Sequence, residues 1–334
     1  MKIESLNPHV RSLRSTFLPS VSVIVPIYNG EADLPDLLNC LRSQTYPCDR
    51  VEYLLVDNGS HDRTLELLQS AHSADFTLRP LSENHIQSSY AARNTGIRAA
   101  TGEILAFTDA DCRPEPNWLI DLMQPFASAT FGLVAGEIKA LPGQTLLEQH
   151  ADRQETLSQK HTLAHRFCPY GQTANLAVRR SAFEQVGLFR PYLTTGGDAD
   201  LCWRVLRETD WQLHFAETAI VRHRHRATLN ELRSQWRRYG KSNRYLHELH
   251  GVDLMHELSL PEYRYRLIRW LVKELPIATA KTLIRQAALV DMVSTPIGLI
   301  CAKARATGQQ QAKLPDSAKQ IDRLTQDSSK PLTL

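Results

Sequence analysis

Two periodicities alternate along the first part of the chain and constrain its fold more than any other feature of the sequence. Continuous apolar runs such as VSVIVPI (21–27) and VEYLLVD (51–57) are typical of strands that are buried on both faces. Between them, segment 31–44 repeats leucine at helical spacing, and segment 62–72 predicts a second helix. Strands that alternate with helices predict βαβ units and an α/β fold with a doubly wound, mainly parallel sheet flanked by helices.

Further segments continue this alternation. A weaker strand, a helix, a strand, a helix and a strand are predicted, in that order, at 76–81, 88–100, 103–109, 116–126 and 131–138. In open sheets of this kind, ligands bind outside the carboxyl ends of the strands. The residues that follow the predicted strands are therefore the first candidates for a site: Tyr28, Asn29, Asp57, Asp109 and Asp111.

Asp109 and Asp111 stand one residue apart, directly after the apolar run ILAF (104–107). Successive side chains of a strand alternate between its two faces, so the two carboxylates can point to the same side. Hard divalent cations take carboxylate oxygens together with phosphate oxygens. The pair therefore predicts a cation site, and the alternative is a solvated turn at the end of a strand.

Composition and the absence of certain motifs exclude several classes of protein. The net charge of +3 is too small to indicate a nucleic-acid binder. No predicted strand is followed by GxGxxG or GxxxxGK[ST], which argues against a dinucleotide-binding Rossmann domain and a P-loop enzyme. The 6 cysteines show no CxxC spacing, as expected in a reducing compartment. We find no signal-peptide pattern at the start, and segment 287–302 is too short to span a membrane, so we expect a cytoplasmic protein.

Five segments in register resemble family 2 glycosyltransferases with the GT-A fold. They are VSVIVPIYNGEADLPDLLNCLRSQTYP, LLVDNGSHDRT, AARNTGIRAATGEILAFTDADCRP, GQTANLAVRRSAFEQVGLF and GGDADLCWR. The resemblance covers residues 20–230 and implies a nucleotide-diphospho-sugar transferase. Such an enzyme moves a sugar, by default from a UDP-sugar, to a saccharide or lipid-linked acceptor, as in polysaccharide biosynthesis. The resemblance also implies Mg²⁺ or Mn²⁺ as cofactor and an inverting reaction.

The resemblance assigns roles in donor binding. Asp109 and Asp111 match the family's DxD motif, in which the second acid contacts the metal and the first contacts the ribose, or the metal through water. His223 matches a third metal ligand after the last strand, and His225 is the weaker choice. The resemblance further assigns nucleotide contacts, although the segments YNG and DNGS also make good turns on their own; these contacts fall on Pro26, Tyr28, Glu31, Asp57 and Arg93.

The segment TGGDADLCWR carries the predicted catalytic base. An inverting transfer needs a group that removes the proton of the acceptor hydroxyl as that hydroxyl attacks. Asp198 matches the family's base, and Asp200 is the second choice. The alternative is that Asp198 only caps a helix, because Asp is among the best N-cap residues. Family members usually carry Glu at the position of Gly197, which puts in doubt whether the acceptor is held as in typical members.

The pocket for the donor sugar and the acceptor is expected near GQTAN and the following helix. The resemblance places Gly171 and Asn175 in this pocket, and a turn before an edge strand is the alternative. Trp203 could form the floor of a sugar site, but its place on a predicted helix favours a Trp in the core of the fold.

Long basic helices are predicted near 228–249 and 261–286. In the second, Trp and Leu recur at helical spacing among cations, which is the pattern of a helix that lies on a membrane surface. The pattern would also fit a helix packed on the catalytic domain with its basic face in water. The residues concerned are Leu267, Trp270, Leu271 and Leu275, with Arg264, Arg266, Arg269 and Lys273. We expect peripheral contact with the inner face of a membrane.

The predicted organisation is an N-terminal extension (1–19), a GT-A glycosyltransferase domain (20–230), a C-terminal helical region (231–308) and a polar, disordered tail (309–334). Two other functions compete with the transferase. A sugar nucleotidyltransferase would need a basic, glycine-rich loop after the first strand, but PIYNGEAD contains no Lys or Arg. A catalytically inactive binding or scaffold protein is supported only by Gly197.

Overall fold

The apolar runs of the first half form strands that are buried on both faces. In the computed structural model, which describes residues 17–71 and 76–324, the central strand β1 pairs in parallel with β2 on one side and β4 on the other, and β3 extends the sheet beyond β2. The bounds are β1 (Val21–Ile27), β2 (Val51–Asp57), β3 (Leu78–Ser82) and β4 (Ile104–Phe107). These four strands confirm the predicted βαβ arrangement, and their carboxyl ends meet at one edge of the sheet.

The remaining strands make the sheet mixed. The order across the sheet is β3-β2-β1-β4-β7-β6-β8-β5. β7 (Leu176–Arg179) runs antiparallel to both β4 and β6 (Phe131–Ala140), and β8 (Gln212–His223) runs parallel to β6. The short β5 (Cys112–Pro114) lies antiparallel to β8 at the edge. The α/β class is as predicted, but the sheet is parallel throughout only on the side of β1 to β4.

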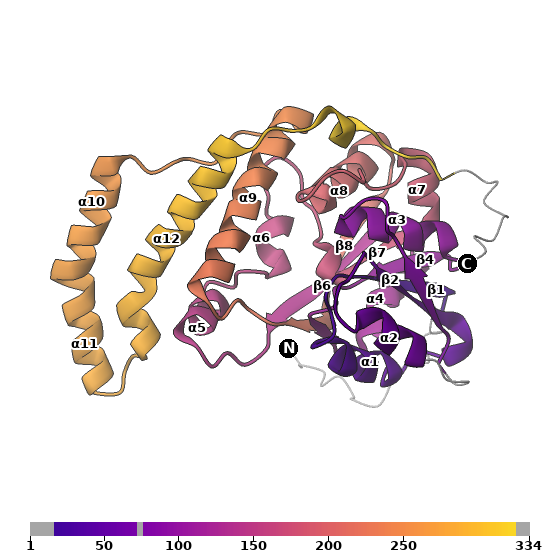
Figure 1. Ribbon diagram of the computed structural model, residues 1–334, viewed down its shortest axis with the longest axis horizontal. Coiled ribbons are helices and arrows are strands. Elements are labelled where there is room, and N and C mark those ends of the chain that lie inside the picture. Colours follow the sequence, from indigo (N-terminus) through magenta and orange to yellow (C-terminus); the bar gives the residue numbers. More distant parts are fainter. Residues whose placement is uncertain (1–16, 72–75, 325–334) are drawn as a thin grey trace, which may run out of the picture.

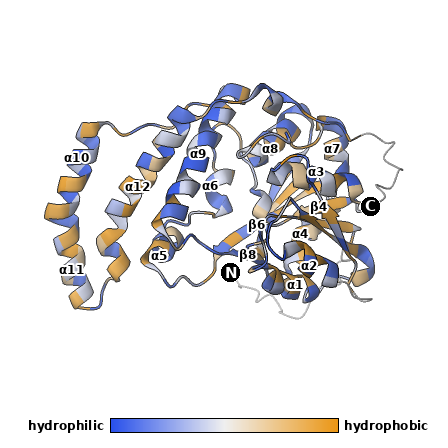
Figure 2. Ribbon diagram, in the orientation of Figure 1, coloured by the Kyte–Doolittle hydropathy of each residue, from blue (hydrophilic) through white to orange (hydrophobic). Residues whose placement is uncertain are grey.

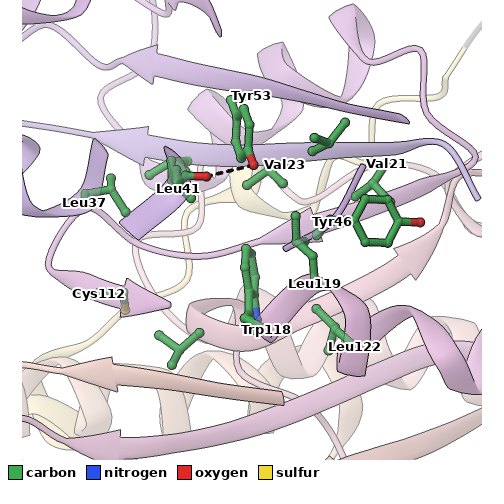
Figure 3. Close-up of a cluster of buried hydrophobic side chains, with 14 of the residues drawn as sticks. Val21, Val23, Leu37, Leu41, Tyr46, Tyr53, Cys112, Trp118, Leu119 and Leu122 are labelled. Atoms are coloured by element: carbon green, nitrogen blue, oxygen red, sulfur yellow. Dashed lines mark hydrogen bonds between the residues drawn. The ribbon is translucent and has the colours of Figure 1, made fainter. Parts of the chain in front are cut away.

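Helices cover both faces of the sheet (Figure 1). Alternate residues of β1 divide between the two hydrophobic layers: Val21, Val23 and Val25 face one, and Ile24 faces the other. The first layer includes α1 (Leu34–Arg42), α2 (Thr64–Ser70) and α4 (Trp118–Met123), and Figure 3 shows part of it, with the Tyr53 hydroxyl donating to the Leu41 carbonyl at 3.1 Å. The second layer includes α3 (Ser89–Ala99), α7 (Arg180–Val186) and α8 (Gly197–Glu208).

A helical extension follows the last strands. It contains α9 (Leu229–His250), then α10 (Leu260–Arg269), the one-turn π-helix η4 (Trp270–Glu274) and α11 (Leu275–Leu283), and finally α12 (Leu289–Gln311). Figure 1 shows α12 lying between α9 and the continuous helix that α10, η4 and α11 form, and the short helices α5 (Leu146–Arg153) and α6 (Gln159–Leu163) near α9. The backbones of α9 and α12 approach so closely at Gly240 and Gly308 that a Cβ at either position would collide with a carbonyl of the other helix.

The tail differs from its prediction. Instead of becoming disordered at residue 309, the chain continues α12 to Gln311, forms the 3₁₀ turn η5 (Asp316–Lys319) and packs back on the catalytic domain. The Leu188 amide donates to the Asp322 carbonyl at 2.8 Å, and Arg98 pairs with the Asp322 carboxylate at 2.6 Å. The disorder predicted for 325–334, and most of the predicted N-terminal extension, lie outside the described residues.

No helix within residues 17–71 and 76–324 combines the length and the apolar character that crossing a membrane requires.

Candidate active site

The parallel register brings three strand ends together at one edge. Ile27 pairs with Asp57, and Ile24 pairs with Phe107, so the segments after β1, β2 and β4 begin side by side. Pro26 is buried within β1. The side of the backbone on which proline lacks an N–H faces β4, and the pairing with β4 ends at Ile24, so the proline costs the sheet no hydrogen bond. Pro26 shapes this edge without offering a polar group to it.

The predicted nucleotide residues lie along the β1 and β2 ends. Tyr28 is half exposed, and its ring meets His61 edge to face at 6.3 Å. Asp57 is buried and accepts a hydrogen bond from the Ser60 amide at 3.3 Å. Glu31 pairs with Arg63 at 2.7 Å, and this contact lowers the pKa of the Glu31 carboxyl. Tyr28 and Asp57 are therefore at the strand edge as expected, whereas Glu31 already has a cationic partner.

Asp109 and Asp111 converge, but through a turn. β4 ends at Phe107, and the Cys112 amide donates to the Asp109 carbonyl at 3.1 Å, so the alternation of a strand is not what brings the acids together. Side-chain ligand atoms of Asp109, Asp111 and Cys112 all lie within 4.8 Å of one another. Burial raises the pKa of the Cys112 thiol well above its usual range, which makes it a poor ligand for a hard cation.

The pairing of β5 with β8 brings His223 close to Asp109 and Asp111. His223 is the last residue of β8 and lies opposite Cys112 in the β5–β8 ladder, which puts its Nε2 3.2 Å from the Asp111 carboxylate. Burial favours the neutral form of Asp111, but the charges of His223 and Arg226 outweigh it and lower the pKa of that carboxyl. His225 is buried nearby, and burial with the neighbouring His223 lowers its pKa to about 4. His223 is therefore the histidine that reaches the acids.

Arg93 joins this cluster from α3. Its guanidinium is almost fully buried, pairs with the Asp109 carboxylate at 2.5 Å and lies over the Tyr90 ring at 5.5 Å. Its Nε has no hydrogen-bond partner among the described residues. Arg93 thus contributes a buried positive charge beside the acids, next to the edge where a nucleotide was expected.

Asp198 lies in the first turn of α8 and is not the residue that caps it. The N-cap is Gly196, which adopts the left-handed conformation with φ of 81°, and no side chain caps this end. The Thr173 hydroxyl donates to the Asp198 carboxylate at 2.9 Å. Burial raises the pKa of Asp198, Arg93 opposes this, and the charge of Asp109 adds to it. The carboxylate is therefore a stronger base than an exposed aspartate, and the capping alternative does not hold.

Tyr90 explains the glycine that replaces the usual glutamate. A Cβ at Gly197 would lie 2.7 Å from the Tyr90 ring, closer than any side chain allows. The space that a Glu side chain would need at residue 197 is therefore filled by an aromatic ring from α3. Gly197 was the only sequence feature that supported an inactive protein. The Tyr90 ring gives a local, steric reason for this glycine.

Asp200 does not qualify as a base. It is fully buried and pairs with Arg190 at 2.9 Å, Arg204 at 3.0 Å and His250 at 3.0 Å. Burial alone would raise the pKa of Asp200, but these partners together lower it. Asp200 lies two residues after Asp198 on α8, and this spacing rotates the direction of a side chain about the helix axis by more than half a turn. Asp200 therefore faces the interior, whereas Asp198 does not.

Two of the three predicted sugar-pocket residues prove to be structural. Asn175 is fully buried: it accepts from Trp118 Nε1 at 2.7 Å and donates to the Glu137 and Ala219 carbonyls at 2.8 Å each. Trp203 is fully buried and donates to the Cys168 carbonyl at 2.8 Å. Neither side chain has a hydrogen-bonding group left for a sugar. Gly171 is buried beside Leu176, and its carbonyl faces the Cys202 thiol.

Three site residues escaped the sequence analysis: Tyr90, Thr173 and Arg226. Arg226 Nη2 lies 3.4 Å from the Asp111 carboxylate. Arg226 could have been identified from the repeated cations of RHRHR at the end of β8. Thr173 could have been identified from its place in GQTAN, just before β7. Nothing local marks Tyr90, because its role depends on the approach of α3 to α8.

A cavity of about 340 Å³ adjoins this cluster. It is lined by the end of β6, the segment between α5 and α6, and Arg222 and His225, which flank His223 in sequence. Gln159, next to the lining residues Ser158 and Lys160, accepts from the Gln172 amide at 2.9 Å. The following residue, Thr173, contacts Asp198, so hydrogen bonds link the wall of the cavity to Asp198, although Asp198 itself does not line the cavity.

Comparisons with known proteins agree with this architecture. Residues 22–187 match the family described as glycosyl transferase family 2. Glycosyltransferase AglE of Haloferax volcanii is 37% identical over 221 residues, which are 66% of this chain and 72% of AglE. The undecaprenyl-phosphate 4-deoxy-4-formamido-L-arabinose transferase of Pseudomonas aeruginosa is 30% identical over 192 residues, which are 54% of this chain and 55% of that protein. The chain therefore belongs to glycosyltransferase family 2 and is a glycosyltransferase.

A solved structure supports the fold. The mannosyltransferase PcManGT from Pyrobaculum calidifontis, in complex with GDP-Man and Mn²⁺, superposes with a TM-score of 0.63. The alignment covers 89% of this chain and 88% of that chain, at 19% identity. The mixed sheet flanked by helices is thus the GT-A fold, as the sequence resemblance predicted.

Proposed function

We propose that the protein is a metal-dependent, inverting glycosyltransferase that moves a sugar from a nucleotide-diphospho-sugar to a saccharide or lipid-linked acceptor. The observation that carries the proposal is the convergence of Asp109, Asp111 and His223 on one side of the site with the partly buried Asp198 on the other. A base can activate the acceptor hydroxyl for an inverting displacement, and a cation can stabilise the charge that develops on the leaving diphosphate.

The donor set fits Mg²⁺ or Mn²⁺. Two carboxylates and an imidazole are ligands that such cations accept, and the buried His223 Nδ1 has no hydrogen-bond partner among the described residues. Asp111 and His223 would hold the ion, with Asp109 beside them. The bound cation would neutralise charge on the departing diphosphate. PcManGT, which was solved in complex with GDP-Man and Mn²⁺, is the structural neighbour that supports this assignment.

Arg226 and Arg93 would complement the cation. Arg226 reaches the Asp111 carboxylate from the segment after β8, so its guanidinium is within reach of phosphate oxygens beside the ion. Arg93 holds Asp109 from the opposite side. Both residues place fixed positive charge where negative charge develops during transfer.

Asp198 would accept the proton of the acceptor hydroxyl as that hydroxyl attacks the anomeric carbon. Burial strengthens it as a base, and Thr173 fixes one of its oxygens, which leaves the other for the acceptor. The cavity beside His225 and Ser158 is our candidate for the acceptor. The proposed domain arrangement follows: residues 20–230 carry the chemistry, and α9 with the later helices forms the extension.

For the donor we propose a UDP-sugar, with Tyr28, Asp57 and Asp109 contacting the nucleotide. An undecaprenyl-phosphate sugar transferase among the relatives supports a lipid-linked acceptor. Such an acceptor would be met at the cytoplasmic face of a membrane, where we place the protein as a peripheral component. The six cysteines are all free thiols, as this compartment favours.

A panel of nucleotide sugars tests the proposal. Each would be incubated with the protein and Mn²⁺ or Mg²⁺, and both the thermal stability of the protein and the slow release of nucleoside diphosphate would be measured. Binding to the folded state raises stability with ligand concentration. We expect one class of donor to stabilise the protein only when the metal is present. If no donor binds with either metal, the transferase proposal fails.

A further inference from the structure

α10, η4 and α11 follow one another as one continuous helix, which together with Ile284 (residues 260–284) projects from the molecule as an arm. Figure 1 shows it at one end, with α12 between it and α9. Two hydrogen bonds join the arm to α12. Trp270 Nε1 donates to the Met292 carbonyl at 2.8 Å, and the Glu274 carboxylate accepts from the Thr295 hydroxyl at 2.5 Å. Trp270 was predicted to lie on the same apolar face as Leu267 and Leu271, and the structure instead assigns it to the packing face.

The arm exposes large apolar side chains to solvent. Leu283 is 80% exposed, Leu260 is 72% exposed and Val272 is 71% exposed. The others are between about half and two-thirds exposed: Tyr265, Leu267, Ile268, Leu271, Ile277 and Ile284. Figure 2 shows these hydrophobic stretches alternating with hydrophilic ones along α10 and α11. Soluble surfaces rarely expose so many large apolar side chains together without a partner.

Cations accompany this apolar surface. Residues 260–285 contain six Arg or Lys residues and two acids, Glu262 and Glu274. Both acids are engaged: Glu262 accepts from Ser259 and His256, and Glu274 pairs with Arg269. Within the described residues, the other five cations have no ion-pair partner: Arg264, Arg266, Lys273, Lys281 and Arg285. The arm therefore presents unbalanced positive charge beside exposed hydrophobic groups.

We infer that the α10–α11 arm docks the protein on the surface of an anionic phospholipid bilayer. Apolar side chains would enter the interface between headgroups and acyl chains, and the cations would meet lipid phosphates. A second copy of the chain is a poorer occupant, because a symmetric contact between two arms would bring cations against cations. The inference concerns the arm alone and does not depend on the proposed function.

α9 is not part of this surface, although the sequence pattern also marked it. Its large apolar residues turn inward, as Leu232 and Leu246 are buried, and among them Leu229 alone exceeds two-fifths exposure. The close contact at Gly240 and Gly308 fixes α9 against α12. The arm is thus the part of the helical extension whose apolar side chains lack a partner among the described residues.

Flotation of the full chain with vesicles tests the inference. Vesicles of phosphatidylcholine would be compared with vesicles that also contain phosphatidylglycerol, at low and high salt. We expect the parent to float with the anionic vesicles at low salt and to be released by salt, which screens charge. The double variant Ile268→Ser/Val272→Ser should reduce the floating fraction by at least tenfold. Leu65→Ser, at a half-exposed leucine of α2, should float like the parent.

Three results of the flotation experiment would overturn the inference: a parent that stays at the bottom with anionic vesicles, equal flotation with neutral vesicles, or a double variant that floats like the parent. Light scattering provides the remaining contrast. A dimer that the double variant dissociates, without any flotation, would identify a second copy of the chain as the occupant and would also overturn it. Binding of a nucleotide sugar with Mn²⁺, followed by thermal shift, reports on the catalytic domain separately, so failure there bears on the proposed function and not on the arm.

Discussion

The strand-end site and the α10–α11 arm use the same kinds of residues in opposite ways. Around the site, apolar side chains such as Leu54 are fully buried, and charged groups such as Arg93 and Asp200 are buried only with partners. On the arm, apolar side chains such as Val272 and Leu283 face solvent, and most cations there lack an ion-pair partner among the described residues. Hydrophobic periodicity therefore reports burial only where the partner surface belongs to the same chain.

The largest expected effect concerns Asp198. Replacing Asp198 with Asn should leave donor binding near that of the parent but slow transfer by about 10²–10⁴-fold, the usual contribution of a positioned base. Burial raises the pKa of Asp198, so this carboxylate takes up a proton at a higher pH than an exposed aspartate does. As the pH is lowered, the transfer rate of the parent should therefore begin to fall at a higher pH than it would with an exposed aspartate as base. Rates over a pH series would check both points. Transfer by Asp198→Asn within a few-fold of the parent would remove Asp198 from the mechanism.

Asp200 sharpens the comparison, since it lies two residues away on the same helix. Asp200→Asn should lower the free energy of unfolding by about 3–5 kcal/mol, because it leaves Arg190 and Arg204 buried without their counter-charge. Denaturant unfolding would measure this loss. Asp210→Asn, at an exposed position just after the same helix, is the matched control and should be close to neutral. A stable Asp200→Asn protein that cannot transfer sugar would instead make Asp200 the base.

Asp111→Ala tests the metal assignment. It removes a charged ligand from a site with few protein ligands, so metal-dependent nucleotide binding should weaken by at least about 100-fold. Calorimetric titration of UDP with Mn²⁺ would record the change. Asp49→Ala, which removes an exposed carboxylate before the start of β2, at the opposite end of that strand from Asp57, should bind as the parent does. Unchanged affinity in Asp111→Ala would contradict a cation at this carboxylate.

Gly197→Glu restores the family's usual residue and should nevertheless destabilise this protein, by about 1–3 kcal/mol, because its Cβ would meet the Tyr90 ring. Thermal unfolding would measure the loss. Adding Tyr90→Ala should recover part of it, as expected for two side chains that compete for one space. Gly298→Glu, placed on α12 where no atom lies within 4 Å of an added Cβ, provides the control for glycine replacement. A single Gly197→Glu variant as stable as the parent would show that the ring moves aside.

The smallest effect is expected on the arm in the absence of lipid. Ile268→Ser/Val272→Ser should change the free energy of unfolding by less than about 0.5 kcal/mol per site, because both side chains already face water. Leu54→Ala, at a fully buried position of β2, should cost about 2–5 kcal/mol. Equal losses in the two variants would mean that the arm is buried in solution, and the contrast between the two regions would disappear.

Part of the site could be read from local pattern, because strand ends follow from periodicity. The apolar runs before Asp57 and Asp109 end where parallel strands meet, whereas His223 was assigned through the resemblance to the family. Asn175 and Trp203 could not be assigned in this way. Their partners, the carbonyls of Glu137, Ala219 and Cys168, lie 35 to 44 residues away, and no local signal says that a polar group will be satisfied by such distant atoms.

The sequence by itself determined the α/β class, the polar edge of the sheet, the acidic pair and the basic, apolar character of the late helices, since each depends on residue type and spacing. Only the tertiary structure decided which of Asp198 and Asp200 faces the site, why residue 197 is glycine, and which late helix keeps its apolar side chains in solvent. Those outcomes depend on the approach of elements distant in sequence: α3 to α8, α9 to α12, and Arg190 and His250 to Asp200. Burial and charge pairing arise from such contacts, and a local pattern contains neither.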